Sequence, residues 1–590
     1  MSVRVARSDA GTVVETDTYG LELDPLEPRA RLVRADGSAP VSLFLLAALD
    51  TDRGLDGTVM HHAPTIAETD GGVVLTFEQA STVWQGKRVR VTCRPDDVEL
   101  VVEVEGSARL TTVRLLGGPY TGNSRWGGGA FHSHWMARTL FDPSPDDPWR
   151  ITSAATEPAT VGVVGGSLPG RGHWFFTPSP FLLAGHPDVD ADPQATEGWQ
   201  TLELRCGVEA ATFTEVRYVP FLGGFSIELA YEGQTAVDGT FATPPLVIRP
   251  TAGTAYTALA EHADALRAAG LAPRVERRRP DWWTRPIFCG WGEQFRHHRL
   301  EGGRAVDWSR REHYDRWLET LAAHGVVPGT IVIDDRWQAT YGGNQPDEER
   351  WPDLRGWIAD RHADGQRVLL WFKAWDPQGL PLDACVTDAL GRAIAADPTS
   401  PAYQALLQAS LRRMLSADGL AADGLKVDFT AQTPSGPGLR RQGDAWGVAL
   451  LHRLLALVYR FAKEANPDAL IVTHTPNPLF ADVTDMIRLN DLLRLEDPQP
   501  FPPAVAQMTH RARVAASMEP GMLIDTDDWC MPSKAEWRAY LAAKPMLGVP
   551  ALYYATGIDT TGEEFSDEDY AAIRQAWAAW EARRTQEEGA

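Results

Sequence analysis

Two charged residues lie inside one short apolar run in the C-terminal half of the sequence. The run is Gly424-Leu-Lys-Val-Asp-Phe429, so Lys426 and Asp428 are two residues apart. On a β-strand their side chains would point to the same side. A charge inside a buried strand costs free energy unless it has a partner or a chemical task. We therefore interpret Asp428 as a catalytic nucleophile and Lys426 as a substrate ligand beside it.

The run that carries this pair is one of eight short apolar runs in the C-terminal half of the chain. Helical patterns separate most of them, and the pattern around Tyr314 and Trp317 has the spacing of an amphipathic helix. Eight strand-helix units over roughly 300 residues predict a (β/α)8 barrel. The eight runs are Pro286–Gly290, Thr330–Ile333, Arg367–Phe372, Gly424–Asp428, Ala469–Thr473, Met486–Leu489, Met522–Ile524 and Ala551–Tyr554.

Polar and aromatic residues gather directly after these runs. Any one of them could be a turn or cap residue, but the same bias after most of the runs favours a shared site. In a (β/α)8 barrel that site lies at the carboxyl ends of the strands. Besides Lys426 and Asp428, the candidate residues are Trp291, Asp334, Asp335, Trp337, Lys373, Trp375, His474, Arg488, Asp491, Asp527 and Asp528.

A site rich in carboxylates and tryptophans suits glycoside chemistry. Carboxylates accept hydrogen bonds from sugar hydroxyls, and breaking a glycosidic bond needs two carboxyl groups. Asp428 and Asp491 follow the fourth and sixth runs, so they would face each other across a sugar. Lys426 would keep Asp428 ionised, whereas Asp491 would need the raised pKa of an acid.

Residues 1–250 have a different pattern, with many short alternating runs separated by Gly, Pro, Asp and Asn. This pattern predicts a large N-terminal β-sandwich. Residues 251–283 then form a linker, because Ala255–Ala269 has a helical pattern and Arg274–Pro280 is charged. The barrel would occupy residues 284–590. The expected fold class is therefore all-β followed by α/β.

Charge and composition exclude several classes of protein. The net charge of −23 argues against nucleic acid or an anionic membrane as the partner. No apolar run approaches a membrane span, and the N-terminus lacks the apolar region of a signal peptide. The five cysteines show no metal-binding or disulfide spacing. We expect a cytoplasmic enzyme that uses no metal and no cofactor.

Four motifs resemble glycoside hydrolase family 36, the α-galactosidase (melibiase) and raffinose-synthase group, which is related to families 27 and 31. Ile333-Asp-Asp-Arg-Trp-Gln338 resembles the I-D-D-G-W-Q motif, and the run Gly424–Phe429 resembles the K-x-D nucleophile strand. Phe288-Cys-Gly-Trp-Gly-Glu-Gln-Phe295 resembles the first strand, and Asp525-Thr-Asp-Asp-Trp-Cys530 resembles the seventh strand. The order and spacing of the motifs match as well.

The resemblance implies a retaining, exo-acting α-glycosidase with α-galactosidase-like activity, no cofactor and a carbohydrate partner. Asp428 would be the nucleophile and Asp491 the acid/base. The N-terminal part would be the β-supersandwich that is usual in this family. Sugar-binding roles are implied for Asp334, Asp335, Lys426 and Arg488.

Two departures from the family pattern leave alternatives open. Arg336 stands where the family has a small residue, so the sugar could be glucose-type, N-acetylated or acidic. Asp491 follows Arg488 by three residues rather than four, so Glu496 and Asp497 are alternative acids. A transglycosylase and, more remotely, a non-catalytic carbohydrate-binding protein also fit the sequence. The oligomeric state stays open, with a homo-oligomer compatible with the sequence.

Overall fold

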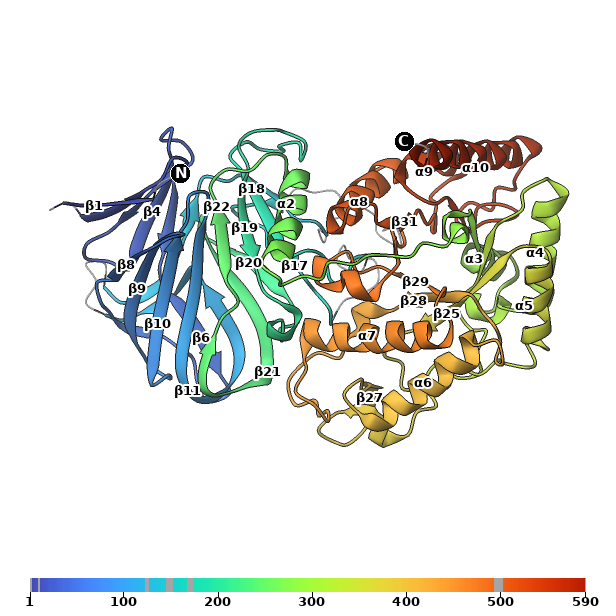
Figure 1. The fold of residues 1–590 in the computed structure, drawn as a ribbon, viewed down its shortest axis with the longest axis horizontal. Coiled ribbons are helices and arrows are strands. Elements are labelled where there is room, and N and C mark those ends of the chain that lie inside the picture. The colour runs from blue at the N-terminus through green and yellow to red at the C-terminus, as the bar shows by residue number, and fades with distance from the viewer. Residues whose placement is uncertain are drawn as a thin grey trace.

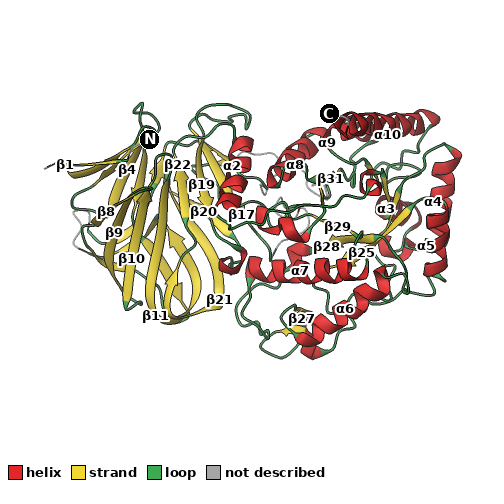
Figure 2. Cartoon of the chain, viewed as in Figure 1, coloured by secondary structure: helices red, strands yellow, loops and turns green. Residues whose placement is uncertain are grey.

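A computed structural model describes residues 3–8, 11–122, 127–144, 152–166, 175–492 and 502–588. Antiparallel sheets form the N-terminal part, and a parallel sheet surrounded by helices forms the C-terminal part (Figure 1; Figure 2). The helix α2 (Ala255–Ala268) contacts both parts. Among the described helices, none is long and apolar enough to cross a membrane.

Two sheets contain the N-terminal strands, and their long members alternate buried and exposed residues. The six-stranded sheet comprises β1 (Arg4–Ser8), β2 (Gly11–Glu15), β3 (Tyr19–Leu23), β4 (Arg29–Arg34), β5 (Val41–Phe44) and β14 (His134–Trp135). The sixteen-stranded sheet comprises β6 (Ala47–Thr51), β7 (Thr58–His61), β8 (Thr65–Thr69), β9 (Gly72–Ser81), β10 (Gly86–Cys93), β11 (Val98–Leu115), β12 (Gly117–Tyr120), β13 (Gly129–His132), β15 (Thr139–Phe141), β16 (Thr152–Ser153), β17 (Ala159–Val161), β18 (Leu182–His186), β19 (Gln200–Leu204), β20 (Val216–Phe221), β21 (Gly224–Ala242) and β22 (Leu246–Arg249).

The eight apolar runs of the C-terminal part are eight parallel strands, as predicted. Their order is the order along the chain, β23-β24-β25-β28-β29-β30-β31, with β32 beside β23. A parallel bridge between Asp525 and Val549 brings the two edges together, so the barrel is nearly closed. The strands are β23 (Ile287–Cys289), β24 (Thr330–Ile333), β25 (Arg367–Lys373), β28 (Gly424–Asp428), β29 (Leu470–Thr473), β30 (Met486–Arg488), β31 (Leu523–Asp525) and β32 (Ala551–Leu552).

Helices connect most of these strands and cover the outside of the barrel (Figure 2). The described connection from β29 to β30 is an exception, because it contains the 3-10 turn Pro478–Val483 in place of an α-helix. A hairpin of β26 (Cys385–Thr387) and β27 (Ala393–Ala396) follows β25. The helices are α3 (Trp291–Glu301), α4 (Arg311–Ala323), α5 (Leu354–Ala363), α6 (Pro401–Leu415), α7 (Gly447–Ala465), α8 (Ala504–Met518), α9 (Lys534–Leu547) and α10 (Asp567–Glu588).

Strand β28 shows how the apolar pattern positions the charges. Leu425 and Val427 are fully buried, and burying each side chain stabilises the fold by about 1.5–3 kcal/mol. Because neighbours on a strand alternate in direction, Lys426 and Asp428 must point to the opposite side. That side is the interior and the mouth of the barrel.

The two parts of the chain are packed tightly where α7 begins. Val448 N donates to Phe213 O at 3.0 Å, and Gly447 has a φ of +56°. A Cβ at Gly447 would lie 1.9 Å from Phe213 O, so both the conformation and the contact require glycine. The N-terminal sheets are therefore in direct contact with the barrel.

Candidate active site

An ion pair between β28 and the end of β24 forms the floor of the barrel mouth. Lys426 Nζ lies 2.6 Å from Asp334 Oδ2, and both side chains are 3% exposed. Cys289 Sγ donates to the same oxygen at 3.0 Å. Burial lowers the pKa of Lys426, but the opposing effects of Asp334 and Cys289 raise it above its ordinary value. Lys426 is therefore charged and held in one place.

Tyr314 on α4 fixes the main chain at Asp334. Its hydroxyl accepts a hydrogen bond from Asp334 N at 2.9 Å and donates to Gln294 Oε1 at 3.1 Å. A Cβ at Gly290 would lie 2.1 Å from that hydroxyl. Glycine after β23 thus makes room for the tyrosine, and the tyrosine sets the position of the carboxylate.

Asp428 is the last residue of β28, and its carboxylate has a donor on each oxygen. Oδ1 accepts from Phe429 N at 2.8 Å and from Arg488 Nη2 at 3.1 Å. Oδ2 accepts from Trp371 Nε1 at 3.1 Å. Burial raises the pKa of Asp428, but Arg488 and Lys426 outweigh this effect and hold the pKa below its ordinary value. Asp428 is therefore ionised at neutral pH, as a carboxylate nucleophile must be.

Asp491 lies three residues beyond the end of β30 and has the opposite electrostatics. Its Oδ1 accepts from Arg488 Nη1 at 3.1 Å, and the side chain is 22% exposed. Burial raises the pKa of Asp491 to about 7, because the nearby charges of Asp527 and Asp428 add to it and Arg488 offsets only part of it. Two carboxyl groups with pKa values pushed apart are the usual arrangement of a general acid and its partner.

Arg488 connects the carboxyl ends of β28, β30 and β31. Besides Asp428 and Asp491, its Nη1 donates to Asp527 Oδ2 at 2.8 Å, and the arginine side chain is 2% exposed. Asp527 is fully buried, and its other oxygen accepts from the backbone of Asp528 and Trp529. The guanidinium therefore fixes both candidate catalytic carboxylates against one buried anion.

One wall of the mouth is formed by the residues at the ends of β24 and β25 and by the loops that follow them. Asp335 Oδ1 accepts from Tyr341 OH at 2.8 Å, and Lys373 Nζ lies 2.9 Å from Asp376 Oδ2. Arg336 and Lys373 both lie over the Tyr341 ring, at 4.8 Å and 4.3 Å from its centroid. Burial raises the pKa of Asp335 to about 7, although the Tyr341 hydroxyl lowers it in part. This wall has two cations and two carboxyl groups, and Lys373 is already paired with Asp376.

Three residues assigned to substrate binding are buried behind the mouth. Trp337 Nε1 donates to Trp371 O at 2.8 Å, and Trp375 Nε1 donates to Thr430 O at 3.3 Å. His474 is fully buried, and burial lowers its pKa to about 4. As placed, each supports a neighbouring segment, and its direct contact with substrate stays a prediction.

Asp528 and Trp291 differ in their placement. Asp528 is fully buried, lies 2.9 Å from Lys544 Nζ, and accepts from Tyr553 N at 2.8 Å. It therefore links β31 to β32. Trp291 is partly exposed and packs edge-on against Trp529, with ring centroids 5.8 Å apart. The alternative acids Glu496 and Asp497 lie outside the described residues.

Sequence reasoning missed several residues of the site. Trp371, which donates to Asp428, has the same strand parity as Lys373, and that parity is a usable signal. Tyr341 lies in a loop, so no periodicity identifies it. Cys289 is the last residue of β23, where any polar side chain could point into the mouth. Within the described residues, no group of three His, Cys, Asp or Glu side chains is arranged to hold a metal.

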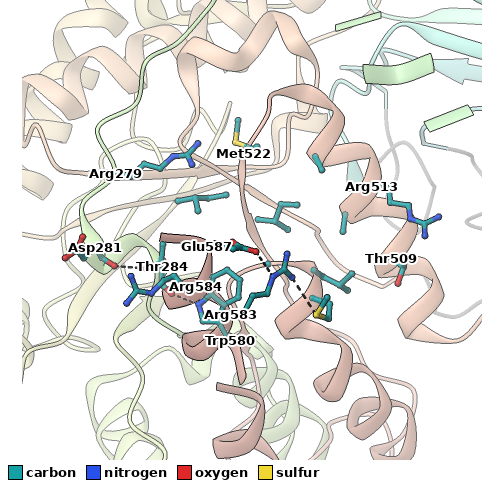
Figure 3. Close-up of a pocket in the computed structure, with 18 of the residues that line it drawn as sticks. Arg279, Asp281, Thr284, Thr509, Arg513, Met522, Trp580, Arg583, Arg584 and Glu587 are labelled. Carbon is teal, nitrogen blue, oxygen red and sulfur yellow. Dashed lines mark hydrogen bonds and ion pairs between the residues drawn. The ribbon is translucent and has the colours of Figure 1, made fainter. Parts of the chain in front are cut away.

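A pocket of about 730 Å³ lies at the other end of the barrel (Figure 3). It is lined by residues that precede β23, β31 and β32, together with parts of α8, α9 and α10. Arg279, Trp580 and Arg583 are among its lining residues. None of the predicted site residues lines it, and active sites of these barrels lie at the carboxyl ends of the strands. This pocket is therefore separate from the candidate site.

Several solved structures that share this fold are glycoside hydrolases. No protein-family model and no curated sequence matches the chain. A family 31 sulfoquinovosidase from E. rectale superposes with a TM-score of 0.58 at 10% identity, over 98% of this chain and 82% of that one. An alpha-galactosidase from Thermus thermophilus gives 0.51 at 15% identity, over 87% and 99%. A cycloalternan-degrading enzyme from Trueperella pyogenes gives 0.52 at 13% identity, over 93% and 82%. The chain has the fold that these enzymes share.

Proposed function

We propose that this protein is a retaining, exo-acting α-glycosidase. The observation that carries the proposal is the Arg488 guanidinium, which contacts both Asp428 and Asp491 at 3.1 Å. One carboxyl has a lowered pKa and the other a pKa of about 7. The shared fold with enzymes described as a sulfoquinovosidase and an alpha-galactosidase supports the same conclusion.

The first chemical step forms a covalent intermediate. Asp428 Oδ2 accepts one hydrogen bond, from Trp371, so it is the oxygen that attacks the anomeric carbon. The bond from that carbon to the leaving oxygen breaks, and Asp491 gives its proton to this oxygen. Asp428 is then esterified to the sugar, and Asp491 is a carboxylate.

The second step releases the sugar. Asp491 takes a proton from water, the water oxygen attacks the anomeric carbon, and the ester bond to Asp428 breaks. Two displacements at one carbon keep the α-configuration. If a second sugar hydroxyl replaces water, the same residues perform transglycosylation.

An α-galactoside is the first substrate to test, because four motifs of the barrel match the α-galactosidase group in order. Lys426, Asp334 and Asp335 would bind sugar hydroxyls at the floor and wall of the mouth. An acidic sugar is the second candidate, because Arg336 and Lys373 both lie over Tyr341, and Lys373 is the residue of β25 that pairs with Asp428.

We further propose that the chain divides as the sequence predicts, into an N-terminal supersandwich of residues 1–250, a linker of residues 251–283 and a barrel of residues 284–590. The last N-terminal strand ends at Arg249 and the first barrel strand begins at Ile287, which supports these limits. Expression of residues 1–250 alone, followed by limited proteolysis, would test whether this part folds by itself.

A panel of aryl α-glycosides tests the proposed activity. It contains the α-galactoside, the α-glucoside, an N-acetylated sugar and a sugar with an anionic C6 group. Proton NMR of the first product identifies the anomer that forms. We expect one sugar of the panel to be cleaved with release of the α-anomer. Release of the β-anomer would contradict the retaining mechanism, and binding without cleavage of any sugar would favour a carbohydrate-binding protein.

A further inference from the structure

The turn that carries Asp491 begins where β30 ends. Leu489 N donates to Asp525 O at 3.0 Å, and Leu492 N donates to Trp529 O at 2.7 Å, so both ends of the turn are tied to the β31 segment. Asn490 between them has a φ of +66°. Asparagine tolerates this left-handed conformation better than most residues. The direction of the Asp491 carboxyl group therefore depends on what holds this turn.

A buried arginine of α8 holds it. Arg511 is 1% exposed, and its Nη1 lies 2.8 Å from the carbonyl oxygens of Leu489, Asn490 and Asp491. One nitrogen has two hydrogens, so the three carbonyls share them. Three consecutive carbonyls can converge on one atom only if the main chain curls around it, which the left-handed Asn490 permits. A charged side chain is costly to bury, and within the described residues Arg511 has no ion-pair partner to offset that cost.

The N-terminal part of the chain contacts the other side of this guanidinium. The ring of Phe175, which lies between β17 and β18, has its centroid 4.0 Å from Arg511 Cζ. Phe175 is 1% exposed, and its carbonyl accepts from Asn490 Nδ2 at 3.4 Å. A cation over an aromatic ring in a buried site is attracted to the ring face. The segment between β17 and β18 thus contacts both the turn and the arginine that holds it.

We propose that Arg511 is a positioning residue for Asp491 and that contact with the Phe175 ring holds Arg511 in place. The proposal rests on the proposed function, in which Asp491 is the acid/base. Arg511 does not touch the substrate. It fixes the main-chain conformation of the turn, and that conformation sets the direction in which the Asp491 carboxyl group delivers its proton. Phe175 makes this position depend on contact between the N-terminal sheets and the barrel.

Arg277 offers a matched control at the opposite end of the same strand. It is a buried arginine of the linker, 3% exposed at its side chain, and it donates to the carbonyls of Thr484 and Ala481 just before β30. Like Arg511 it donates to main-chain carbonyls, but it also forms an ion pair with Glu519 at 2.7 Å. It lies away from the barrel mouth, so its loss should affect stability without affecting proton delivery.

The test compares Arg511→Lys and Arg277→Lys on two substrates of the sugar that the panel identifies. One is an aryl glycoside with an acidic phenol, which needs little help to leave, and the other is an alkyl glycoside, which needs the acid. We expect Arg511→Lys to lower kcat/KM for the alkyl glycoside by about 30-fold or more and for the aryl glycoside by less than about 5-fold. Arg277→Lys should lower both equally, if at all.

Equal losses on the two substrates for Arg511→Lys, or no loss on either, would overturn the proposal. Asp491→Ala is measured beside it. If Asp491→Ala shows no dependence on the leaving group, the assignment of the acid in the proposed function fails. If Asp491→Ala shows the dependence and Arg511→Lys does not, only the role of Arg511 fails.

Phe175→Leu keeps the question answerable if Arg511→Lys does not fold. It preserves an apolar contact and removes the ring face. We expect a loss in the same direction, about 5-fold for the alkyl glycoside with the aryl glycoside nearly unchanged. If Phe175→Leu changes kcat/KM by the same factor for both substrates, Phe175 does not have this role. If Arg511→Lys also fails to fold, that result overturns the whole proposal.

Discussion

The two candidate catalytic carboxylates are held in different ways. Asp428 is part of a strand, and backbone, indole and guanidinium donors fix both of its oxygens. Asp491 lies in a turn beyond its strand, and its carboxylate has one ion pair within the described residues, with Arg488. The strand-held group is rigid and ionised, whereas the turn-held group has a pKa near neutrality. The difference suits a nucleophile that stays charged and an acid that must gain and lose a proton.

The largest expected effect is at the strand-held residue. Asp428→Asn should lower kcat by at least about 1000-fold on every leaving group, because no other group forms the covalent intermediate. Steady-state kinetics on the cleaved aryl glycoside would measure it, with thermal unfolding as the control for folding. Activity at a tenth of the unmodified level or more would contradict the assignment.

At the turn-held residue the effect should depend on the substrate. Asp491→Ala should lower kcat/KM by about 100-fold or more for poor leaving groups and by less than about tenfold for activated ones. Rates on a series of aryl and alkyl glycosides would give the dependence. Equal losses of kcat/KM for poor and activated leaving groups would favour Glu496 or Asp497 as the acid.

The pH profile should separate the two groups as well. Asp491 must be protonated for the first step, so kcat/KM should fall as the pH rises through about 7. The pKa of Asp428 is held below its ordinary value, which is about 3.9. The profile of kcat/KM should therefore show no limb from Asp428 between about pH 4 and neutrality. Asp335 also has a pKa of about 7, so Asp335→Asn is the control. If that variant loses the limb and retains activity, Asp335 is the titrating group.

The floor beside the strand-held nucleophile should be sensitive to loss of one charge. Lys426→Met leaves Asp334 buried without its cation, which should lower the free energy of unfolding by about 3–5 kcal/mol. Denaturant unfolding would measure it. Lys426→Met combined with Asp334→Leu should recover most of the loss, since no buried charge remains unpaired. A double variant as unstable as the single one would show that the ion pair is not the cause.

The smallest expected effect is at another residue held in a turn. Arg336 has a φ of +91°, so Arg336→Gly relieves backbone strain and should change the free energy of unfolding by no more than about 1 kcal/mol. Because the guanidinium leaves the Tyr341 ring, KM should change while kcat stays within about threefold. An anionic sugar should lose about tenfold or more in affinity. A fall in kcat with unchanged KM would contradict a binding role.

The strands of the barrel were predictable because local patterns specify them. Each is a short apolar run between helical patterns, and a polar residue at its carboxyl end must point into the mouth. Asp428 could be proposed from the sequence because it lies inside such a run. Asp491 needed the spacing from Arg488 as well, and its pKa could not be read from the sequence because it depends on burial and on charges from other strands.

Residues that act through long-range packing could not be found from local patterns. Phe175 lies more than 300 positions before Asn490, and only the fold brings them together. Arg511 gives a weak signal, because it shares the buried face of α8 with Met508 and Ala515, and a charge on that face needs a partner. Tyr341 lies in a loop after β24 whose path depends on the neighbouring strand.

Trapping the covalent intermediate tests the central claim most directly. A 5-fluoro glycosyl fluoride of the cleaved sugar slows both steps, and its good leaving group allows the intermediate to accumulate. Mass spectrometry of the intact protein and of its peptides locates the sugar. We expect one added glycosyl unit per chain, on the peptide that contains Asp428, and none in Asp428→Asn. A sugar attached to any other residue, or turnover of the probe with no attachment, would contradict the mechanism.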